Sequence, residues 1–245
     1  MTNKNFCEYG DLLMARPILI YGHPAAGKSY AFKTLNPDTT VILDVDNKGA
    51  LPWRGFKKHY NAEKNNFFSV DTLDRIIKAI KKIDSDDAFK HVKVLGVDGL
   101  NNALVNEQCF YDDWHQPKNS YEKYSELPRK TKLIFRLAQN MRKDLTVIFT
   151  AHVKCADPYT PNDIDHLLTP GKQLEEQFRI EGNFLYVFYA KVDKDGNHFF
   201  ETCPINSSVR APEGCFPPTI PNDLKAIIET ISDYETGGNN EDDST

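Results

Sequence analysis

The stretch "IYGHPAAGKSY" at residues 20–30 decides the fold. Within it, residues 22–29 match G-x-x-x-x-G-K-[ST], a glycine-rich loop whose backbone N–H groups surround phosphates. The motif follows the apolar run "RPILIYG" (16–22), which predicts a buried strand, and opens a predicted helix over 27–35 that ends at Asn36-Pro37. Strand, loop and helix N-terminus in this order are the arrangement that a bound phosphate requires.

The residues of this loop have distinct expected roles toward ATP. Lys28 is expected to place its ammonium group against the β- and γ-phosphates, and Ser29 to offer its hydroxyl to Mg²⁺. Gly27 lets the backbone approach the phosphates closely because it has no side chain. The residues expected to bind the nucleotide are Gly22, His23, Pro24, Ala25, Ala26, Gly27, Lys28, Ser29 and Tyr30.

A phosphate-binding loop of this kind needs a second metal ligand, usually a carboxylate at the end of a neighbouring strand. The run "VKVLGVD" at 92–98 predicts such a strand and makes Asp98, together with Ser29, the expected Mg²⁺ ligand. Gly99 follows at the position where some ATPase classes place a water-activating glutamate. The group that activates water must therefore come from elsewhere in the chain.

Two aspartates close the strand predicted for "VILDVD" at residues 41–46. A carboxylate at a strand end beside the phosphate-binding loop can orient the attacking water. Asp46 is favoured as this catalytic base because it lies nearer the end of the strand, and Asp44 remains the alternative. Since an aspartate is shorter than the usual glutamate, slow hydrolysis is expected.

The run "DLTVIFTAHV" at 144–153 predicts a fourth strand, which ends in polar residues. Thr150 and His152 are expected at the carboxyl edge of the sheet, where α/β sheets bind their ligands. His152 is the candidate sensor, since a polar side chain there can contact the γ-phosphate and report its loss. The proline-rich stretch 154–176 is expected to be the long loop that receives this signal.

The remaining pattern sets the fold class. A helix is predicted over 71–83 with Asp71 as its cap, another over about 121–143, and a last one over 221–231 capped by Asn222 or Asp223. Two strand-like runs around Asp195-Gly196 predict a hairpin. Strands and helices alternate up to about residue 153, and strands follow one another afterwards. This order predicts an α/β fold with a mostly parallel central sheet and a C-terminal antiparallel extension.

Length and composition fit a globular protein with one domain. The chain has 245 residues, of which 1–234 are expected to form the domain and 235–245 a disordered acidic tail. The net charge is −5, and the four acidic residues of the tail account for most of it, so the body is nearly neutral. Five scattered cysteines without C-x-x-C spacing argue against a disulfide framework or zinc site. We expect a cytoplasmic protein without a membrane partner, because no long apolar run is present.

These features together resemble the RecA-like ATPases. The resemblance is closest to the short phage and prophage ATP-binding proteins that act in single-strand annealing and recombination. It spans roughly residues 15–232, and is carried by "GHPAAGKS", "VILDVD", "VLGVDG", "VIFTAHV" and, late in the chain, "VRAPEGCF" and "IPNDLKAIIETI". It implies a RecA-like P-loop NTPase core, Mg²⁺-dependent ATP hydrolysis, binding of single-stranded DNA, and annealing or strand exchange in the bacterial host cytoplasm.

The resemblance also implies partners. RecA-like proteins assemble head to tail as rings or filaments, and a basic residue of one subunit completes the next subunit's site. Arg210, in "SSVRAP", is the candidate for this catalytic role, with Lys191 as the alternative. A trans cation of this kind stabilises charge that develops on the γ-phosphate. A single-strand-binding protein is a further partner to be expected.

Contacts with DNA would require local basic patches, because the body is nearly neutral. Lys154 and Lys172 lie in the long loop after the fourth strand. Single strands bind to cations interleaved with aromatic rings. Two clusters qualify: Lys57, Lys58 and His59 beside Trp53 and Phe56, and Arg129, Lys130, Lys132 and Arg136 on a predicted helix. Either cluster can equally be an ordinary solvated face.

Two other functions remain open. A small P-loop kinase would usually carry an arginine-rich lid after the sensor strand, and residues 153–178 contain no arginine. A nucleotide-gated, non-catalytic scaffold in a phage replication complex is compatible with the weak basic patches and with Asp46 in place of a glutamate. A GTPase is disfavoured because Asn47-Lys48-Gly49-Ala50 lacks the aspartate of the base-reading motif.

Overall fold

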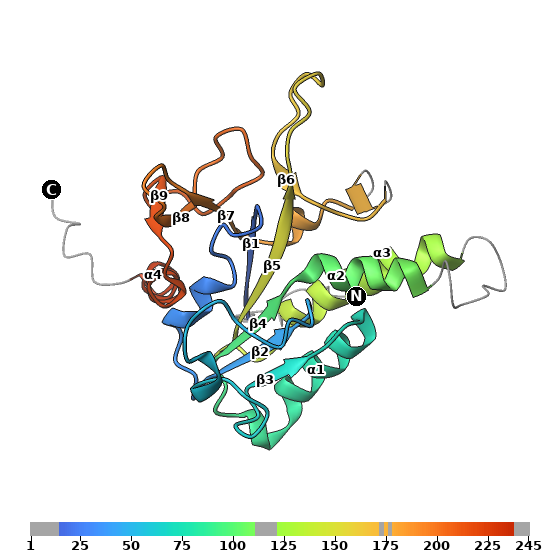
Figure 1. Ribbon diagram of the computed structural model, residues 1–245, viewed down its shortest axis with the longest axis vertical. Helices are drawn as coiled ribbons and strands as arrows, with labels where there is room; N and C mark the ends of the chain where they lie inside the picture. The colour runs from blue at the N-terminus through green and yellow to red at the C-terminus, as the bar shows by residue number, and fades with distance from the viewer. Residues whose placement is uncertain (1–14, 111–121, 172–173, 176–177, 238–245) are drawn as a thin grey trace, which may run out of the picture.

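The computed structural model describes residues 15–110, 122–171, 174–175 and 178–237, and these form an α/β architecture (Figure 1). Nine strands of the described residues belong to one mixed, mostly parallel sheet. They are β1 (Arg16–Gly22), β2 (Thr40–Asp44), β3 (Phe67–Ser69), β4 (Val94–Asp98), β5 (Thr146–Lys154), β6 (His166–Leu167), β7 (Tyr186–Val192), β8 (His198–Glu201) and β9 (Thr219–Pro221).

The strand order is β3-β2-β4-β5-β1-β7-β8-β9, and β6 pairs with β5 outside this path. In this spatial order, β3, β2, β4, β5, β1 and β7 run parallel to one another, whereas β7, β8 and β9 pair antiparallel. The mostly parallel sheet and the antiparallel extension are therefore confirmed. The loop predicted to bind phosphate follows β1, and β5 lies between β1 and β4, so three strand ends from distant parts of the sequence meet at one edge.

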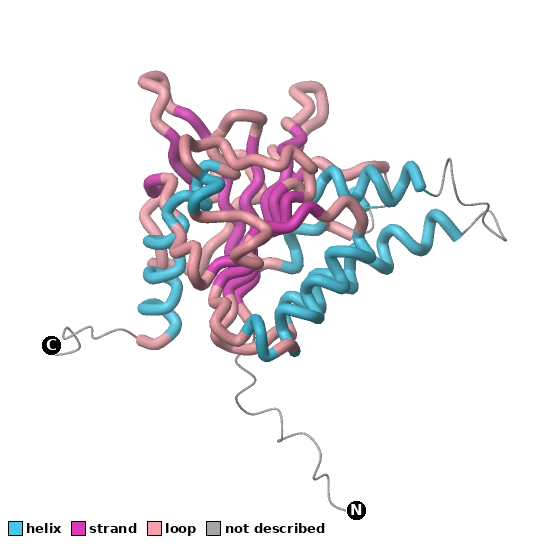
Figure 2. The backbone as a smooth tube through the Cα atoms, turned by 60° about the horizontal axis from the view of Figure 1, so that its bottom comes forward, coloured by secondary structure: helices cyan, strands magenta, loops and turns pink. Residues whose placement is uncertain are grey.

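Two layers cover the sheet (Figure 2). The helices α1 (Leu73–Ser85), α2 (Leu100–Cys109) and α3 (Glu122–Gln139) pack on one face, and α4 (Leu224–Glu235) on the other with the short 3₁₀ helices η1 (Tyr30–Thr34) and η2 (Phe56–Lys58). Successive residues of β1 pack in turn against one layer and the other, because side chains alternate between the two faces of a strand. Leu19 and Tyr21 join the first core, and Ile18 and Ile20 join the second.

The helix predicted over 71–83 is confirmed as α1, which buries Leu73, Ile76, Ile77, Ile80 and Ile83 along one face. Its cap is not Asp71, as expected, but Thr72, whose hydroxyl accepts the N–H of Arg75 at 3.3 Å. In α4, Asp223 is the cap, and its carboxylate accepts the N–H of Ala226 at 3.1 Å.

The helix predicted over 27–35 is wrong. The chain forms only η1, a single short 3₁₀ helix, and the residues between Gly27 and Tyr30 are turns. The sequence offers a local reason. Leu35 already has an extended backbone (φ −80°, ψ 153°), and Pro37 disfavours the α conformation at Asn36, so only a few residues separate the loop from this stop.

Several elements were not foreseen. The strands β3, β6 and β9 and the helix α2 lie where no element was predicted, and β6 interrupts the expected loop 154–176. The start of the expected acidic tail is also wrong, since Glu235 ends α4 and pairs with Arg16 at 2.5 Å. Residues 238–245 of that tail lie outside the described residues.

No helix of the described residues has both the length and the apolar character needed to cross a membrane.

Candidate nucleotide-binding site

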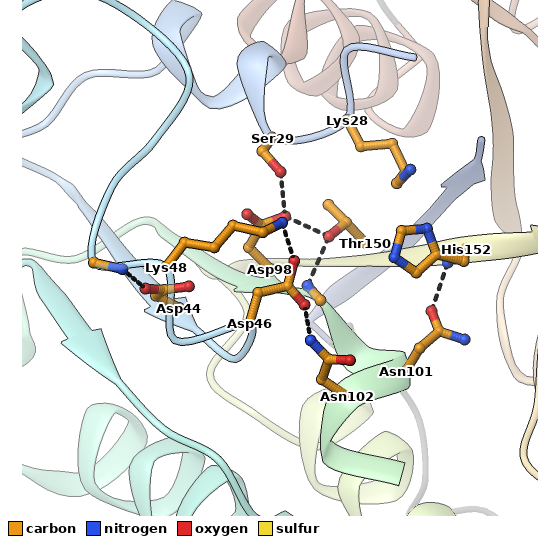
Figure 3. A network of polar contacts seen from close by, with 12 residues as sticks. Lys28, Ser29, Asp44, Asp46, Lys48, Asp98, Asn101, Asn102, Thr150 and His152 are labelled. Carbon is orange, nitrogen blue, oxygen red and sulfur yellow. Dashed lines mark hydrogen bonds and ion pairs between the residues drawn. The ribbon is translucent and has the colours of Figure 1, made fainter. Parts of the chain in front are cut away.

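The carboxyl ends of four neighbouring parallel strands bring the predicted site residues together. Gly22, which ends β1 and begins the loop, lies opposite His152 of β5, and Asp44 of β2 lies opposite Asp98 of β4. This edge is where open α/β sheets bind ligands. Figure 3 shows the side chains that converge on it.

The lysine of the phosphate-binding loop is held inside its own loop. Lys28 Nζ donates to the carbonyl oxygens of Gly22 and His23, both at 2.7 Å. The side chain is buried, and this burial lowers the pKa of Lys28 to about 8, although the charge of Asp98 opposes the shift. An ammonium group kept in a loop of backbone dipoles can exchange these carbonyls for a more strongly charged phosphate.

The hydroxyl of Ser29 points at the carboxylate of Asp98. Ser29 Oγ donates to Asp98 Oδ1 at 2.9 Å, and Thr150 Oγ1 donates to the same oxygen at 2.5 Å. Thr150 in turn accepts the N–H of Gly99 at 2.9 Å. Burial raises the pKa of Asp98, while the hydrogen bonds from Thr150 and Ser29 work against that shift. A hydroxyl facing a carboxylate fits Mg²⁺, which binds few protein oxygens beside phosphates and water.

The structure separates the two candidate bases. Asp46 lines the pocket, where its Oδ1 accepts from Asn102 Nδ2 at 2.6 Å and its Oδ2 pairs with the ammonium group of Lys48. Asp44 instead accepts the N–H of Gly49 at 2.7 Å and stabilises the turn after β2. Asp46 therefore has the position expected of a water-orienting group, and Asp44 has a structural contact.

Asp46 also explains the glycine that follows Asp98. Gly99 has φ = 95°, a conformation that side chains strongly disfavour, and a Cβ added there would lie 2.1 Å from Asp46 Oδ1. The carboxylate from β2 thus occupies the space that a side chain at position 99 would need. A glutamate directly after Asp98 is incompatible with Asp46 in this position.

His152 lines the pocket at the end of β5. Burial, followed by the charge of Lys28, lowers the pKa of His152, so its ring is neutral near pH 7. Its backbone N–H donates to Asn101 Oδ1, and Asn101 Nδ2 donates to the carbonyl of Leu168 on the returning end of the loop 154–176. His152 is therefore connected to that loop both through the amide of Asn101 and directly, since the N–H of Leu168 donates to the carbonyl of His152 at 2.8 Å.

The pocket has a volume of about 500 Å³, which suits a small ligand such as a nucleotide. Its lining residues are Pro24, Ala25, Ala26, Gly27, Lys28, Ser29, Tyr30, Asp46, Lys48, Ala50, Leu51, Pro52, Asp98, Gly99, Thr150, Ala151, His152 and His198. Most of the residues predicted to bind the nucleotide are in this set. Gly22 and His23 are not, and act through the carbonyl groups that hold Lys28.

The two cations proposed to act between subunits lie elsewhere. Arg210 does not line the pocket, and its backbone pairs with Val187. Lys191 pairs with Glu201 and lies over the ring of Tyr189, 4.5 Å from its centroid. Within this chain neither reaches the nucleotide pocket.

The predicted basic clusters differ in character. On α3, Lys130 is buried and pairs with Glu107 at 2.6 Å and Asp74 at 2.8 Å, and Arg129 pairs with Glu126 at 2.5 Å. Lys154 pairs with Glu175, and Lys172 lies outside the described residues. These contacts argue against a DNA-binding role for Lys130, Arg129 and Lys154.

The cluster after β2 remains a candidate for DNA binding. Lys57, Lys58 and His59 are exposed, and Trp53 is half-buried beside them. Phe56 is buried against Trp53 and Phe67 and is not available for stacking on a base.

Four residues of the site were not predicted. Lys48 had a readable signal, because it follows the strand end "VILDVD" at the edge where ligands bind. Asn101 and Asn102 resemble ordinary amides of a helix, and only the packing of α2 on β5 gives them a role. His198 reaches the pocket from β8, and the sequence carries no signal for this.

Comparison with known proteins gives one partial similarity. No family model matches the chain. A curated protein, ATP-dependent 6-phosphofructokinase 2 of Clostridium perfringens, is 31% identical over 83 residues, which are 34% of this chain and 23% of that protein. The chain thus matches less than a quarter of the length of this relative, and no family is shown.

Proposed function

We propose that this protein is a P-loop ATPase that hydrolyses ATP in the presence of Mg²⁺. The observation that carries the proposal is the contact between Ser29, at the end of the phosphate-binding loop, and Asp98, at the end of β4. A hydroxyl and a carboxylate hold Mg²⁺ in ATPases with this loop, and the contact between these two residues, distant in sequence, supports the same role here. The buried Lys28 beside them supplies the charge for a triphosphate.

The residues divide the work as follows. Lys28 binds the β- and γ-phosphates, Ser29 and Asp98 would hold Mg²⁺, and Asp46 orients the attacking water. Mg²⁺, when bound, neutralises charge that develops on the phosphates. Thr150 fixes the carboxylate of Asp98, and His152 in its neutral form can donate one hydrogen bond to the γ-phosphate and report its loss.

Phosphate release from ATP, measured with purified protein, tests this proposal. Lys28→Ala is expected to abolish ATP binding while the protein stays folded. Lys78→Ala is the matched control, because Lys78 is exposed on α1 and does not line the pocket. Hydrolysis by Lys28→Ala at the wild-type rate would exclude this loop as the catalytic site.

The proposed cellular role is recombination on single-stranded DNA, with annealing or strand exchange by a homo-oligomer. The resemblance to phage ATP-binding recombination proteins supports it. One feature of the structure supports it as well: the exposed basic residues Lys57 and Lys58 belong to the same connection as Leu51 and Pro52, which line the pocket. A single strand of DNA bound to Lys57 and Lys58 would contact the same chain segment that lines the candidate nucleotide pocket.

Fluorescence anisotropy with a labelled oligonucleotide tests this role. Binding is expected to weaken with salt, because lysine contacts to phosphates release counterions. Lys57→Glu with Lys58→Glu is expected to weaken binding, whereas Lys78→Glu with Lys81→Glu, an equal charge change at exposed lysines of α1 outside both candidate clusters, is expected to leave it unchanged. ATP hydrolysis that rises on addition of single strands would support the role, and no binding at low salt would refute it.

A small kinase is the second candidate. The partial similarity to a phosphofructokinase favours it, since that name describes ATP-dependent phosphate transfer to a sugar phosphate. The two candidates differ in the acceptor of the phosphoryl group. ADP formed in equal amounts with inorganic phosphate indicates hydrolysis, whereas ADP formed without phosphate, only when a sugar phosphate is added, indicates a kinase.

A further inference from the structure

A second lysine faces the candidate nucleotide pocket. Lys48 lies in the turn after β2, lines the pocket, and pairs through its ammonium group with Asp46 (Figure 3). Its side chain is 61% exposed, so few packing contacts oppose a change of its conformation, whereas the side chain of Asp46 is only 7% exposed. A partly exposed cation is thus paired with the carboxylate that is proposed to orient water.

The backbone of this turn fixes where Lys48 can reach. Asn47 and Gly49, on either side, both have left-handed backbone conformations, with φ of 53° and 63°. Asp44 anchors the turn by accepting the N–H of Gly49 at 2.7 Å. This anchored turn places Lys48 at the strand ends, where it lines the pocket.

The charged groups around Lys48 are carboxylates at the candidate site and at the strand end beside it. Partial burial works to lower the pKa of Lys48, but the hydrogen bond and charge of Asp46, with Asp98 and Asp44, raise it above the ordinary value. Lys48 also repels Lys28, which is part of the reason that the pKa of Lys28 is low. Mutual repulsion between two lysines disappears when both bind the same polyanion.

We propose that Lys48 is a catalytic residue that leaves Asp46 and binds the γ-phosphate of ATP, in the same subunit as Lys28. This inference rests on the proposed ATPase function. The exchange frees one oxygen of Asp46 for the attacking water and places a cation on the phosphoryl group. Lys48 thereby supplies in cis the charge that the resemblance had assigned to a neighbouring subunit.

The exchange is favourable in electrostatic terms. A carboxylate carries one negative charge, and the terminal phosphate carries more charge over three oxygens, so the ammonium group is attracted more strongly to the nucleotide. In the reaction, the oxygen of water forms a bond with the γ-phosphorus and the bond to the bridging oxygen of ADP breaks. Asp46 takes the proton from water and returns it to the phosphate, and Lys48 keeps its proton throughout.

Three variants test the role of Lys48. Lys48→Met removes the charge and keeps most of the length, Lys48→Arg keeps the charge, and Lys64→Met is the control, because Lys64 is exposed on the same connection and donates to the carbonyl of Lys58. We expect Lys48→Met to lower the single-turnover hydrolysis rate about 100-fold, the range found when one charge-stabilising donor is lost. The Kd for a fluorescent ATP analogue should change less than threefold, and Lys48→Arg should recover part of the rate.

A mixing experiment tests whether Lys48 acts in cis. Lys28→Ala lacks the nucleotide site and Lys48→Met lacks the proposed cation, so a residue acting between subunits would restore hydrolysis when the two proteins are mixed. We expect no recovery beyond the sum of the separate rates. Recovery would overturn the cis assignment.

The failures of the two proposals are distinguishable. Hydrolysis by Lys48→Met at the wild-type rate, or a Kd weakened as much as the rate, would overturn the role of Lys48 and leave the ATPase standing. Wild-type protein that binds no ATP, or binds it without hydrolysis under any condition tested, would overturn the proposed function and this inference with it.

Discussion

Ser29 and Asp98, which are 69 positions apart in the sequence, are joined by a hydrogen bond of 2.9 Å at the carboxyl edge of the sheet. The loop after β1 supplies the hydroxyl, and the last residue of β4 supplies the carboxylate. Because β5 lies between these two strands, its Thr150 can reach the same carboxylate oxygen. The three side chains form one polar group on which the proposed metal site depends.

Removing either member of this pair should cost affinity only when Mg²⁺ is present. We expect Ser29→Ala and Asp98→Asn each to weaken Mg²⁺-ATP binding at least tenfold, about 1.4 kcal/mol. Titration of a fluorescent ATP analogue with Mg²⁺ and with EDTA measures this, and Ser85→Ala, at an exposed serine of α1, is the control. Equal losses for Ser29→Ala in Mg²⁺ and in EDTA would show that the hydroxyl does not act through the metal.

Binding of ATP should take up protons near pH 8. The pKa of Lys28 in the free protein is lowered from 10.5 to about 8, and a bound phosphate favours the protonated form. At pH 8 roughly half of the free molecules lack this proton, so binding takes up about half a proton, and affinity falls as the pH rises above 8. Calorimetry in two buffers with different ionisation enthalpies measures the uptake. Little uptake by Lys28 is expected at pH 6.5, and binding heats that do not differ between buffers at pH 8 would contradict the assignment.

A methyl group at position 99 should disturb both stability and hydrolysis. Gly99→Ala must accept a positive φ and displace Asp46, whereas Gly55→Ala meets the same kind of φ with no atom within 4 Å. The conformational penalty of about 1–2 kcal/mol is shared, so Gly99→Ala should lose clearly more stability than Gly55→Ala and most of its hydrolysis. Urea denaturation and phosphate release measure the two effects. Equal stabilities with full activity would mean that Asp46 does not need its observed position.

The buried pair between α2 and α3 should matter for stability and not for nucleotide binding. Glu107 is 3% exposed at its side chain and accepts from Lys130 at 2.6 Å. We expect Glu107→Gln to destabilise the fold by about 1–2 kcal/mol, less than the loss of a wholly unpaired buried charge, because Lys130 keeps its pair with Asp74. The double variant Glu107→Leu with Lys130→Met should recover most of this loss. A urea midpoint of Glu107→Gln that equals wild type would show that the pair contributes little.

The meeting of Lys28, Ser29 and Asp98 at one place could be predicted because short motifs mark these residues. The pattern at 22–29 and the apolar run that ends in Asp98 each need only a few adjacent residues, and the parallel sheet brings their ends to one edge. The choice between Asp44 and Asp46 could not be made with certainty, because it depends on the turn at Gly49. Asp44 and Asp46 look alike in the sequence, but in the structure Asp46 lines the pocket and Asp44 accepts a hydrogen bond from the turn.

The elements that were not predicted are stabilised by contacts between residues that are distant in the sequence. The helix α2 carries polar amides in its first turns, and they bond to the turn after β2, to β5 and to the loop after β6. The predicted helix after Gly27 is only the single 3₁₀ helix Tyr30–Thr34. Sequence periodicity describes an isolated segment and does not distinguish such a short 3₁₀ helix from the first turns of an α-helix.

The brevity of η1 has a consequence for how this protein attracts anions. A helix of several turns presents a fixed partial positive charge at its start, and the five residues of η1 offer little of it. Attraction to a polyphosphate would then depend on the N–H groups of the loop and, more than in a protein with a long helix here, on ionisable side chains, Lys28 above all. Such a source of attraction is weakened by ionic strength and by alkaline conditions, so occupancy of the pocket becomes adjustable by the surrounding solution.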